Sequence, residues 1–163
     1  MDFLAVIRAK YLIINGWNIF QTQLIFRLLL SMIFKKELKK LAEARLKDSE
    51  ILLRNRRYDS ATYLCGYALE LALKARICRT LKWIGFPSSN REFQNCKSLK
   101  THNLDVLLAF SGLEDKIKNN FFPEWSVVTL WKPEHRYRPL GSENKNTTLN
   151  MIDASKKLIF ALR

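Results

Sequence analysis

The segment at residues 61–85 is the strongest constraint on how this chain folds. It reads ATYLCGYALELALKARICRTLKWIG, and its apolar residues fall on nearly every side of a helix. Such a helix must be covered by neighbours all round, so it belongs inside a bundle. Small residues let those neighbours approach closely: Ala61, Cys65, Gly66, Ala68 and Ala72. We therefore expect a central helix at 61–84, with Leu69, Leu73 and Ile77 almost fully buried.

Further helices are predicted on both sides of this segment. Residues 35–57 are rich in strong helix formers, with leucines near helical spacing among charged residues. The stretch YDS at 58–60 is predicted to end that helix, with Asp59 or Ser60 as the N-cap of the next.

The C-terminal half is predicted to add shorter helices. We expect them at 102–112, after a Thr101 cap, from Glu114 to about Phe122, and at 149–162, after a Thr147 or Thr148 cap. Residues 125–131 fit either an extended or a helical stretch. The expected fold class is therefore all-α, an antiparallel four-to-five-helix bundle.

Length, charge and cysteine usage narrow the class of protein. A chain of 163 residues is long enough for one domain with a real core. Its net charge of +13 favours anionic partners such as RNA, nucleotides or acidic proteins, although a basic protein without such a partner is also possible on charge alone. Three cysteines without metal-ligand spacing predict no disulfide framework, no metal, no other cofactor and a cytoplasmic location: Cys65, Cys78 and Cys96.

The N-terminal residues 1–34 differ from the rest of the chain in composition. Residues 11–34 are apolar and long enough to raise the question of a membrane span. Polar residues interrupt them and make a span unlikely: Asn15, Asn18, Gln21, Gln23 and Arg27. A docked amphipathic helix, a weak membrane anchor, or an extension ahead of a true start at Met32 remain as alternatives. We predict an N-terminal extension at 1–34 and a helical domain at 35–163.

Three stretches of the sequence together resemble a known family. They are RLKDSEILLRNRRYDSATYLCGYALELALKARI at 45–77, KTHNLDVLLAFSGL at 100–113 and WKPEHRYRPLG at 131–141. The chain resembles the HEPN domain, the higher eukaryote and prokaryote nucleotide-binding domain, over about residues 38–162. The resemblance implies a helical bundle that forms a homodimer. It also implies a nucleotide, RNA or protein partner, such as a minimal nucleotidyltransferase in a toxin–antitoxin pair, or a role in defence.

The ribonuclease members of that family carry a motif that this sequence lacks. The motif is an Arg, four to six residues and then His, near the start of the last long helix. Positions at that spacing before His102 are Lys97, Cys96 and Asn95. Those before His135 are Leu130, Thr129 and Val128, and the last helix has no His. Lysine lacks the planar fork of arginine, so Lys97 is not an equivalent replacement.

Candidate ligand-binding residues come from three separate segments. Glu70 and Lys74 are the charged pair inside the most apolar helix, and a buried Glu70 needs a cationic partner. Lys100 and His102 stand at a helix start, where backbone N–H groups favour anions. The proline-bracketed loop adds basic forks and a ring that suit phosphate and a base: Arg136, Tyr137 and Arg138.

Two interpretations of this cluster follow. Arg136, Tyr137, His102 and Glu70 are predicted to converge in space, with Arg136 either bound to an anionic ligand or paired with Glu70 or Asp105 as a structural tie. The missing motif favours a non-catalytic HEPN-type binding module. The alternative is a divergent, metal-independent HEPN ribonuclease that uses His102 or His135 with Arg136 or Arg138.

Overall fold

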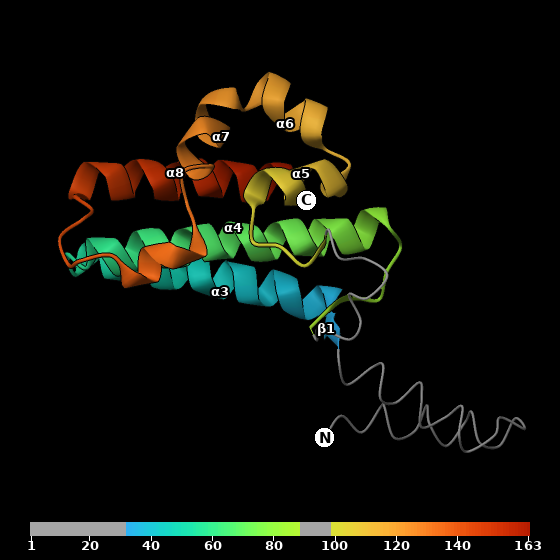
Figure 1. Ribbon diagram of the computed structural model, residues 1–163, viewed down its shortest axis with the longest axis horizontal. Coiled ribbons are helices and arrows are strands. Elements are labelled where there is room, and N and C mark those ends of the chain that lie inside the picture. Colours follow the sequence, from blue (N-terminus) through green and yellow to red (C-terminus); the bar gives the residue numbers. More distant parts are fainter. Residues whose placement is uncertain (1–31, 89–98) are drawn as a thin grey trace, which may run out of the picture.

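The computed structural model describes residues 32–88 and 99–163, and this part of the chain is mostly helical (Figure 1). Helices and strands follow one another in this order: β1 Met32–Phe34, α3 Lys35–Arg54, α4 Tyr58–Thr80, β2 Gly85–Pro87, α5 Leu104–Ser111, α6 Glu114–Asn120, α7 Phe122–Val128, the 3-10 helix η2 Pro133–Tyr137, and α8 Lys145–Ala161. The predicted all-α fold is confirmed, with β1 and β2 as its one small sheet in the described residues.

Helix α4 lies between α3 and α8, and α6 and α7 cover the far side of α8 (Figure 1). Helices α3 and α4 form an antiparallel hairpin. Helix α8 runs in the same direction as α4. Thr148 near its start bonds to Thr62 near the start of α4, and Arg79 near the end of α4 bonds to the main chain of Arg163. The chain makes this parallel pair possible by returning through α5, α6, α7 and η2.

The core is built around α4, as its apolar sequence predicts. Leu69, Leu73 and Ile77 each have 0% of their surface exposed, which confirms their predicted burial. Leu38 of α3, Leu107 of α5 and Leu158 of α8 pack into the same core. A helix that buries nearly every side has no free polar face, so its few charged residues meet other helices or a cleft.

Two predicted helix boundaries are wrong in the turn between α3 and α4. Helix α3 ends at Arg54, and α4 already begins at Tyr58, so the YDS stretch lies inside α4. The turn is made by Asn55, Arg56 and Arg57, with Arg56 at a left-handed φ of 59°. Asp59 is therefore not an N-cap, and its carboxylate is available to bind elsewhere.

Later caps also differ from the prediction. Asn103, not Thr101, caps α5 by accepting from two backbone N–H groups. Asn144 caps α8 in a capping box with Thr147. Helix α8 therefore begins at Lys145 rather than at the predicted residue 149. Asparagine oxygens at both places outcompete the threonines because they reach the free N–H groups of the first turn.

The small sheet joins the two ends of the α3–α4 hairpin. Ile33 pairs with Phe86 in the antiparallel register of β1 and β2. Strand β1 lies before residue 35, the predicted start of the helical domain. The pairing of β1 with β2 was not predicted from the sequence. Residues 1–31 lie outside the described structure. Within residues 32–88 and 99–163, no helix combines the length and apolar character needed to cross a membrane.

Candidate functional site

The two charged residues inside α4 are joined to each other. Lys74 Nζ donates to Glu70 Oε1 over 2.5 Å, one helical turn away. The Glu70 side chain is 1% exposed and that of Lys74 is 16% exposed. Because an unpaired buried carboxylate is strongly destabilising, the four-residue spacing of the sequence supplies the cation that Glu70 requires.

His102 is the second partner of Glu70. Its Nδ1 atom lies 2.9 Å from the same Oε1 atom, and its side chain is 63% exposed. His102 immediately precedes Asn103, the cap that fixes the start of α5. The predicted convergence of Glu70 and His102 is therefore present in the structure. The bond to Nδ1 orients the ring so that its other nitrogen, Nε2, is left for a ligand or a proton.

Two clefts meet at this histidine. One, of about 290 Å³, lies beside Glu70 and Lys74 and is also lined by Lys100 and His102. The other, of about 400 Å³, shares Lys100 and His102 and continues to Lys132 at the start of η2. We call the paired clefts the Lys100–His102 site. Lys132, next to Trp131 in the proline-bracketed loop, was expected from the sequence to be exposed, as it is, and was not among the candidate ligand-binding residues.

Arg136 lies elsewhere, and its predicted pairing with Glu70 or Asp105 is wrong. Its guanidinium carbon is 4.9 Å from the centre of the Tyr137 ring, and hydrogen bonds to Tyr63 and Tyr137 raise the pKa of Arg136. Glu70 is already paired within α4, and Asp105 accepts a hydrogen bond from Trp125 Nε1 over 2.9 Å. The described structure records no bond from Arg136 to either carboxylate.

Packing of Trp131 explains why Arg136 is displaced from the predicted position. The indole ring lies against Gly66, where a Cβ atom would come within 2.2 Å of it, and Trp131 Nε1 donates to the Tyr63 carbonyl over 3.1 Å. These contacts place η2 beside Tyr63, about two helical turns before Glu70. Arg136 and Tyr137 therefore do not join the Glu70–His102 pair, and Tyr137 is 77% exposed.

The second arginine of the loop, Arg138, lines a separate groove of about 720 Å³ with His135. Arg138 pairs with Glu143 over 3.4 Å. Both ring nitrogens of His135 are buried without a hydrogen-bond partner in the described structure. Burial, and then the nearby charge of Arg138, lower the pKa of His135. The imidazole is therefore held in its neutral form near pH 7.

Asp59 was predicted to be a helix N-cap, whereas in the structure it binds the backbone of a distant loop. Its two carboxylate oxygens accept from the backbone N–H groups of Gly141 and Glu143, each over 2.8 Å. These bonds tie the segment after η2 to the first turn of α4, and the bond from Gly141 is the main cause of a lowered pKa for Asp59. The residue type could be noticed in the sequence, but its distant backbone partners could not.

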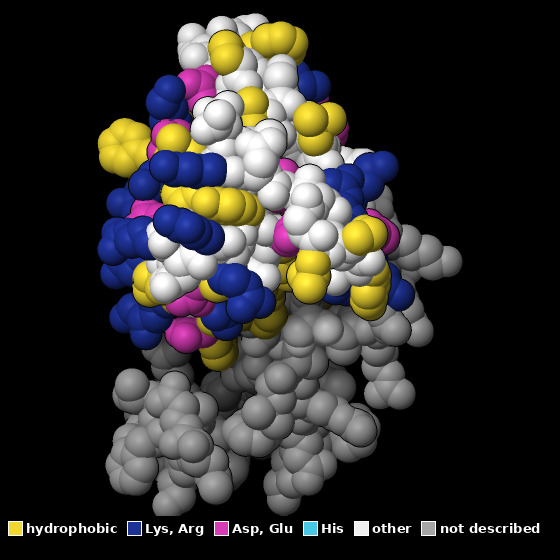
Figure 2. Space-filling view, turned by 90° about the vertical axis from the view of Figure 1, so that its left-hand side faces the viewer, with side chains coloured by type: hydrophobic (Ala, Val, Ile, Leu, Met, Phe, Trp, Pro, Cys, Tyr) yellow, Lys and Arg dark blue, Asp and Glu magenta, His cyan; other side chains and the backbone are white. Residues whose placement is uncertain are grey.

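A basic surface adjoins the clefts through η2. Figure 2 looks onto the end of the bundle where α3 ends and α4 begins, and lysine and arginine side chains gather along one side of it. Exposed basic residues in the segments at this end include Arg54, Arg56, Arg57, Arg136, Arg138 and Lys145. The second cleft of the Lys100–His102 site reaches η2. A chain of linked phosphates that lies in this cleft could therefore continue onto the basic groups of the protein beyond it.

The chemistry available at the Lys100–His102 site is anion binding and proton transfer. Lys100 offers a fixed positive charge, and a carboxylate-oriented imidazole can donate to an oxyanion or exchange a proton. Within the described residues, no group of three or more His, Cys, Asp or Glu side chains is arranged to hold a metal ion.

Comparison with known families gives one match. The model of the HEPN domain matches residues 36–83, the span of α3, α4 and the turn between them. No curated protein and no solved structure matches the chain. A HEPN domain suggests a function related to nucleotides or RNA. The resemblance seen in the sequence is thus confirmed over residues 36–83, where the helical hairpin matches the model of the HEPN domain.

Proposed function

We propose that this protein is a non-catalytic HEPN-type binding module that recognises the phosphates of RNA or of a nucleotide at the Lys100–His102 site. The observation that carries the proposal is the placement of exposed Lys100 and His102 where two clefts meet, with the ring of His102 oriented by Glu70. The basic surface beyond η2 adds the charge that a polyanion needs.

The absence of catalysis is proposed from the surroundings of His102. In the ribonuclease members, an arginine accompanies the histidine and steadies charge on the phosphate. No arginine lines either cleft of the Lys100–His102 site in the described part of the chain. Lys100 supplies a point charge instead of a planar fork, which suits binding better than stabilisation of a transition state.

The binding proposal is tested by fluorescence anisotropy with a labelled single-stranded RNA and with labelled ATP. Lys100→Ala and His102→Ala should each weaken binding about tenfold or more, since a hydrogen bond to a charged group contributes about 1.5–3 kcal/mol. Lys47→Ala, an exposed change on α3, is the control and should retain affinity close to that of the wild type. Equal affinity of all variants for both ligands would refute the proposal.

A second candidate function rests on the Glu70–His102 contact. A carboxylate on Nδ1 fixes the tautomer of the imidazole and leaves Nε2 to exchange protons, an arrangement used in general acid–base catalysis. A divergent, metal-independent ribonuclease would therefore use His102 with Lys100. RNA cleavage in the presence of a metal chelator, lost in His102→Ala and reduced in Glu70→Gln, would select this function over simple binding.

A protein partner belongs to the same proposal. HEPN-type modules pair with one another or with a minimal nucleotidyltransferase, and a toxin–antitoxin or defence role in the cytoplasm would follow from such a pair. Size-exclusion chromatography with light scattering measures homodimer formation. Copurification with the product of a neighbouring gene measures the second partnership.

A further inference from the structure

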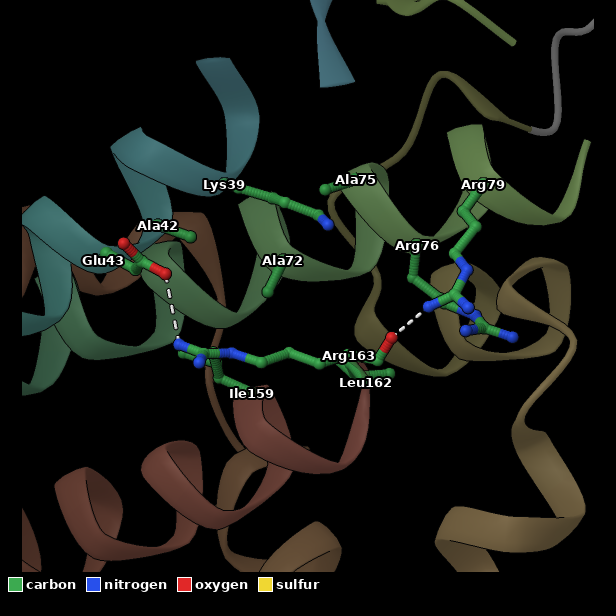
Figure 3. Close-up of a pocket in the computed structure, with 10 residues that line it drawn as sticks. All are labelled: Lys39, Ala42, Glu43, Ala72, Ala75, Arg76, Arg79, Ile159, Leu162 and Arg163. Carbon is green, nitrogen blue, oxygen red and sulfur yellow. Dashed lines mark hydrogen bonds and ion pairs between the residues drawn. The ribbon is translucent and has the colours of Figure 1, made fainter. Parts of the chain in front are cut away.

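Another cleft lies on the side of α4 that faces away from the Lys100–His102 site. It has a volume of about 250 Å³ and lies between α3, α4 and the end of α8 (Figure 3). At about 100° per residue, Arg76 and Arg79 project roughly opposite to Glu70 and Lys74 on the same helix. We call this the three-helix cleft, and its chemistry is independent of the proposed function.

The floor of the three-helix cleft is made of small residues. Ala42 of α3 and Ala75 of α4 are each 2% exposed, and Ala72 is 9% exposed. Longer side chains here would fill the space between the helices. The alanines instead leave a hollow whose rim carries the charges, with side chains from all three helices (Figure 3).

Four cations and one carboxylate line the rim. Arg163 Nη2 pairs with Glu43 Oε1 over 3.1 Å, which uses the carboxylate. Arg76 Nε donates to the Ser111 carbonyl over 3.4 Å, and Arg79 donates to the main-chain oxygen of Arg163. Lys39 has no bonded partner among the described residues, and Figure 3 shows its amine directed over the cleft.

The two arginines of α4 form no ion pair with a carboxylate side chain among the described residues. They lie three residues apart on one helix, a spacing at which like charges repel. Burial, and then the charge of Arg79, lower the pKa of Arg76, so its charged form is held at a cost. Their recorded bonds are to main-chain oxygens, and each guanidinium has five N–H groups to donate. An anion in the cleft would relieve this repulsion.

We propose that the three-helix cleft binds a phosphate or diphosphate group. Arginine forks match the geometry of phosphate oxygens, and Lys39 adds a point charge on the opposite wall. Ligand pockets for drug-sized molecules occupy roughly 300–1,000 Å³, so a cleft of about 250 Å³ suits a phosphoanion better than a whole nucleoside. The group can be free, the end of a nucleotide, or the 5′-phosphate of an RNA.

Isothermal titration calorimetry with inorganic pyrophosphate tests the site on the full chain. The double variant Arg76→Gln/Arg79→Gln should lose affinity about tenfold or more, because two charge-assisted contacts are removed. The double variant Lys40→Gln/Lys47→Gln removes the same charge from exposed positions of α3 and should bind like the wild type. Equal losses in both variants, or no binding to the wild type, would overturn the proposal.

Further measurements keep the test decisive. Lys39→Gln changes an exposed side chain, so it should fold normally and still bind pyrophosphate several-fold more weakly than the wild type. Wild-type affinity in Lys39→Gln and in the arginine variant would refute the site. The same titration with ATP and with RNA identifies the molecule that carries the phosphate. A ligand held at this cleft binds the wild type more tightly than the arginine variant, and an RNA held by its end does so with a 5′-phosphate but not with a 5′-hydroxyl. Pyrophosphate binding that survives in the arginine variant but is lost in Lys100→Ala would assign the ion to the Lys100–His102 site and overturn the proposal.

Discussion

Two acidic residues of α4 hold different parts of the molecule in place. Glu70, deep in the helix, binds the side chains of Lys74 and His102. Asp59, in the first turn, binds backbone N–H groups of the segment that leads from η2 to α8. One carboxylate orients a candidate ligand-binding residue, and the other fixes the position of a loop.

The Asp59 tie predicts a stability change that depends on pH. Asp59→Ala should lower the free energy of unfolding by about 1–3 kcal/mol at pH 7, since hydrogen bonds to a charged group are lost. Backbone bonds lower the pKa of Asp59 from its ordinary 3.8, so this contribution is complete above that value and is lost as the pH falls below it. Urea unfolding of the wild type and the variant at pH 7 and near pH 3 measures the difference.

The control for Asp59 is Asp153→Ala, at an exposed position of α8. This variant should be close to the wild type at both pH values. A difference between wild type and Asp59→Ala that stays constant down to low pH would show that the side chain, and not its charge, supports the loop.

How much of the site could be predicted depends on whether its contacts are local. Glu70 and His102 were predicted to lie close together because a buried carboxylate inside an apolar helix needs polar partners. The same reasoning chose the wrong cation, since it favoured the distant Arg136 over Lys74, which the helix itself brings within reach. The position of Arg136 depends on Trp131 lying against Gly66, a fit of shapes that has no periodicity to reveal it.

Two helices carry the same Glu-to-Lys spacing in opposite surroundings. In α4 the pair Glu70–Lys74 is buried, and in α6 the pair Glu114–Lys118 is exposed, with 2.6 Å between its atoms. Screening by water makes an exposed pair weak, whereas a buried pair leaves an uncompensated charge when one partner is removed. The two pairs therefore give a matched comparison within one molecule.

Lys74→Met should lower the free energy of unfolding by about 3–5 kcal/mol, the range for breaking a buried pair. Lys118→Met, the same change at the same spacing, should leave stability nearly unaltered. Chemical unfolding followed by circular dichroism measures both. If the two variants lose equal stability, the burial of Glu70 is not what makes its partner necessary.

The central helix could be predicted from the sequence, whereas several element ends could not. An apolar segment with no polar face can only be interior, so the burial of α4 follows from composition alone. Its start was misplaced because YDS offers good cap residues, and the chain instead turns at Arg56 in the left-handed region. The strands β1 and β2 are too short for an alternating pattern to be recognised.

At the scale of the whole molecule, the structure offers surfaces on different sides of one central helix. The Lys100–His102 site lies on one side of α4 and the three-helix cleft on the other. A net charge of +13 over the chain raises the local concentration of any polyanion around both. The two sites can therefore be tested separately in one protein, with salt concentration held fixed between measurements.

Removal of residues 1–31 tests the predicted extent of the domain. The described fold begins with β1 at Met32, so a chain starting there should fold cooperatively and melt within a few degrees of the full chain. Thermal unfolding by circular dichroism measures this. A large drop in melting temperature, or loss of solubility, would show that the N-terminal segment contributes to the core. Removal of residues 1–34, which also deletes β1, should cost more stability than removal of 1–31.

The contact between Gly66 and Trp131 ties together two positions that are far apart in the chain. A methyl group at 66 would collide with the indole ring, and a smaller residue at 131 would leave a hollow beside the glycine. A substitution at either position alone would therefore disrupt the packing. In any set of related sequences, we expect residues 66 and 131 to vary as a pair, with a side chain at 66 appearing only where the ring at 131 has been lost.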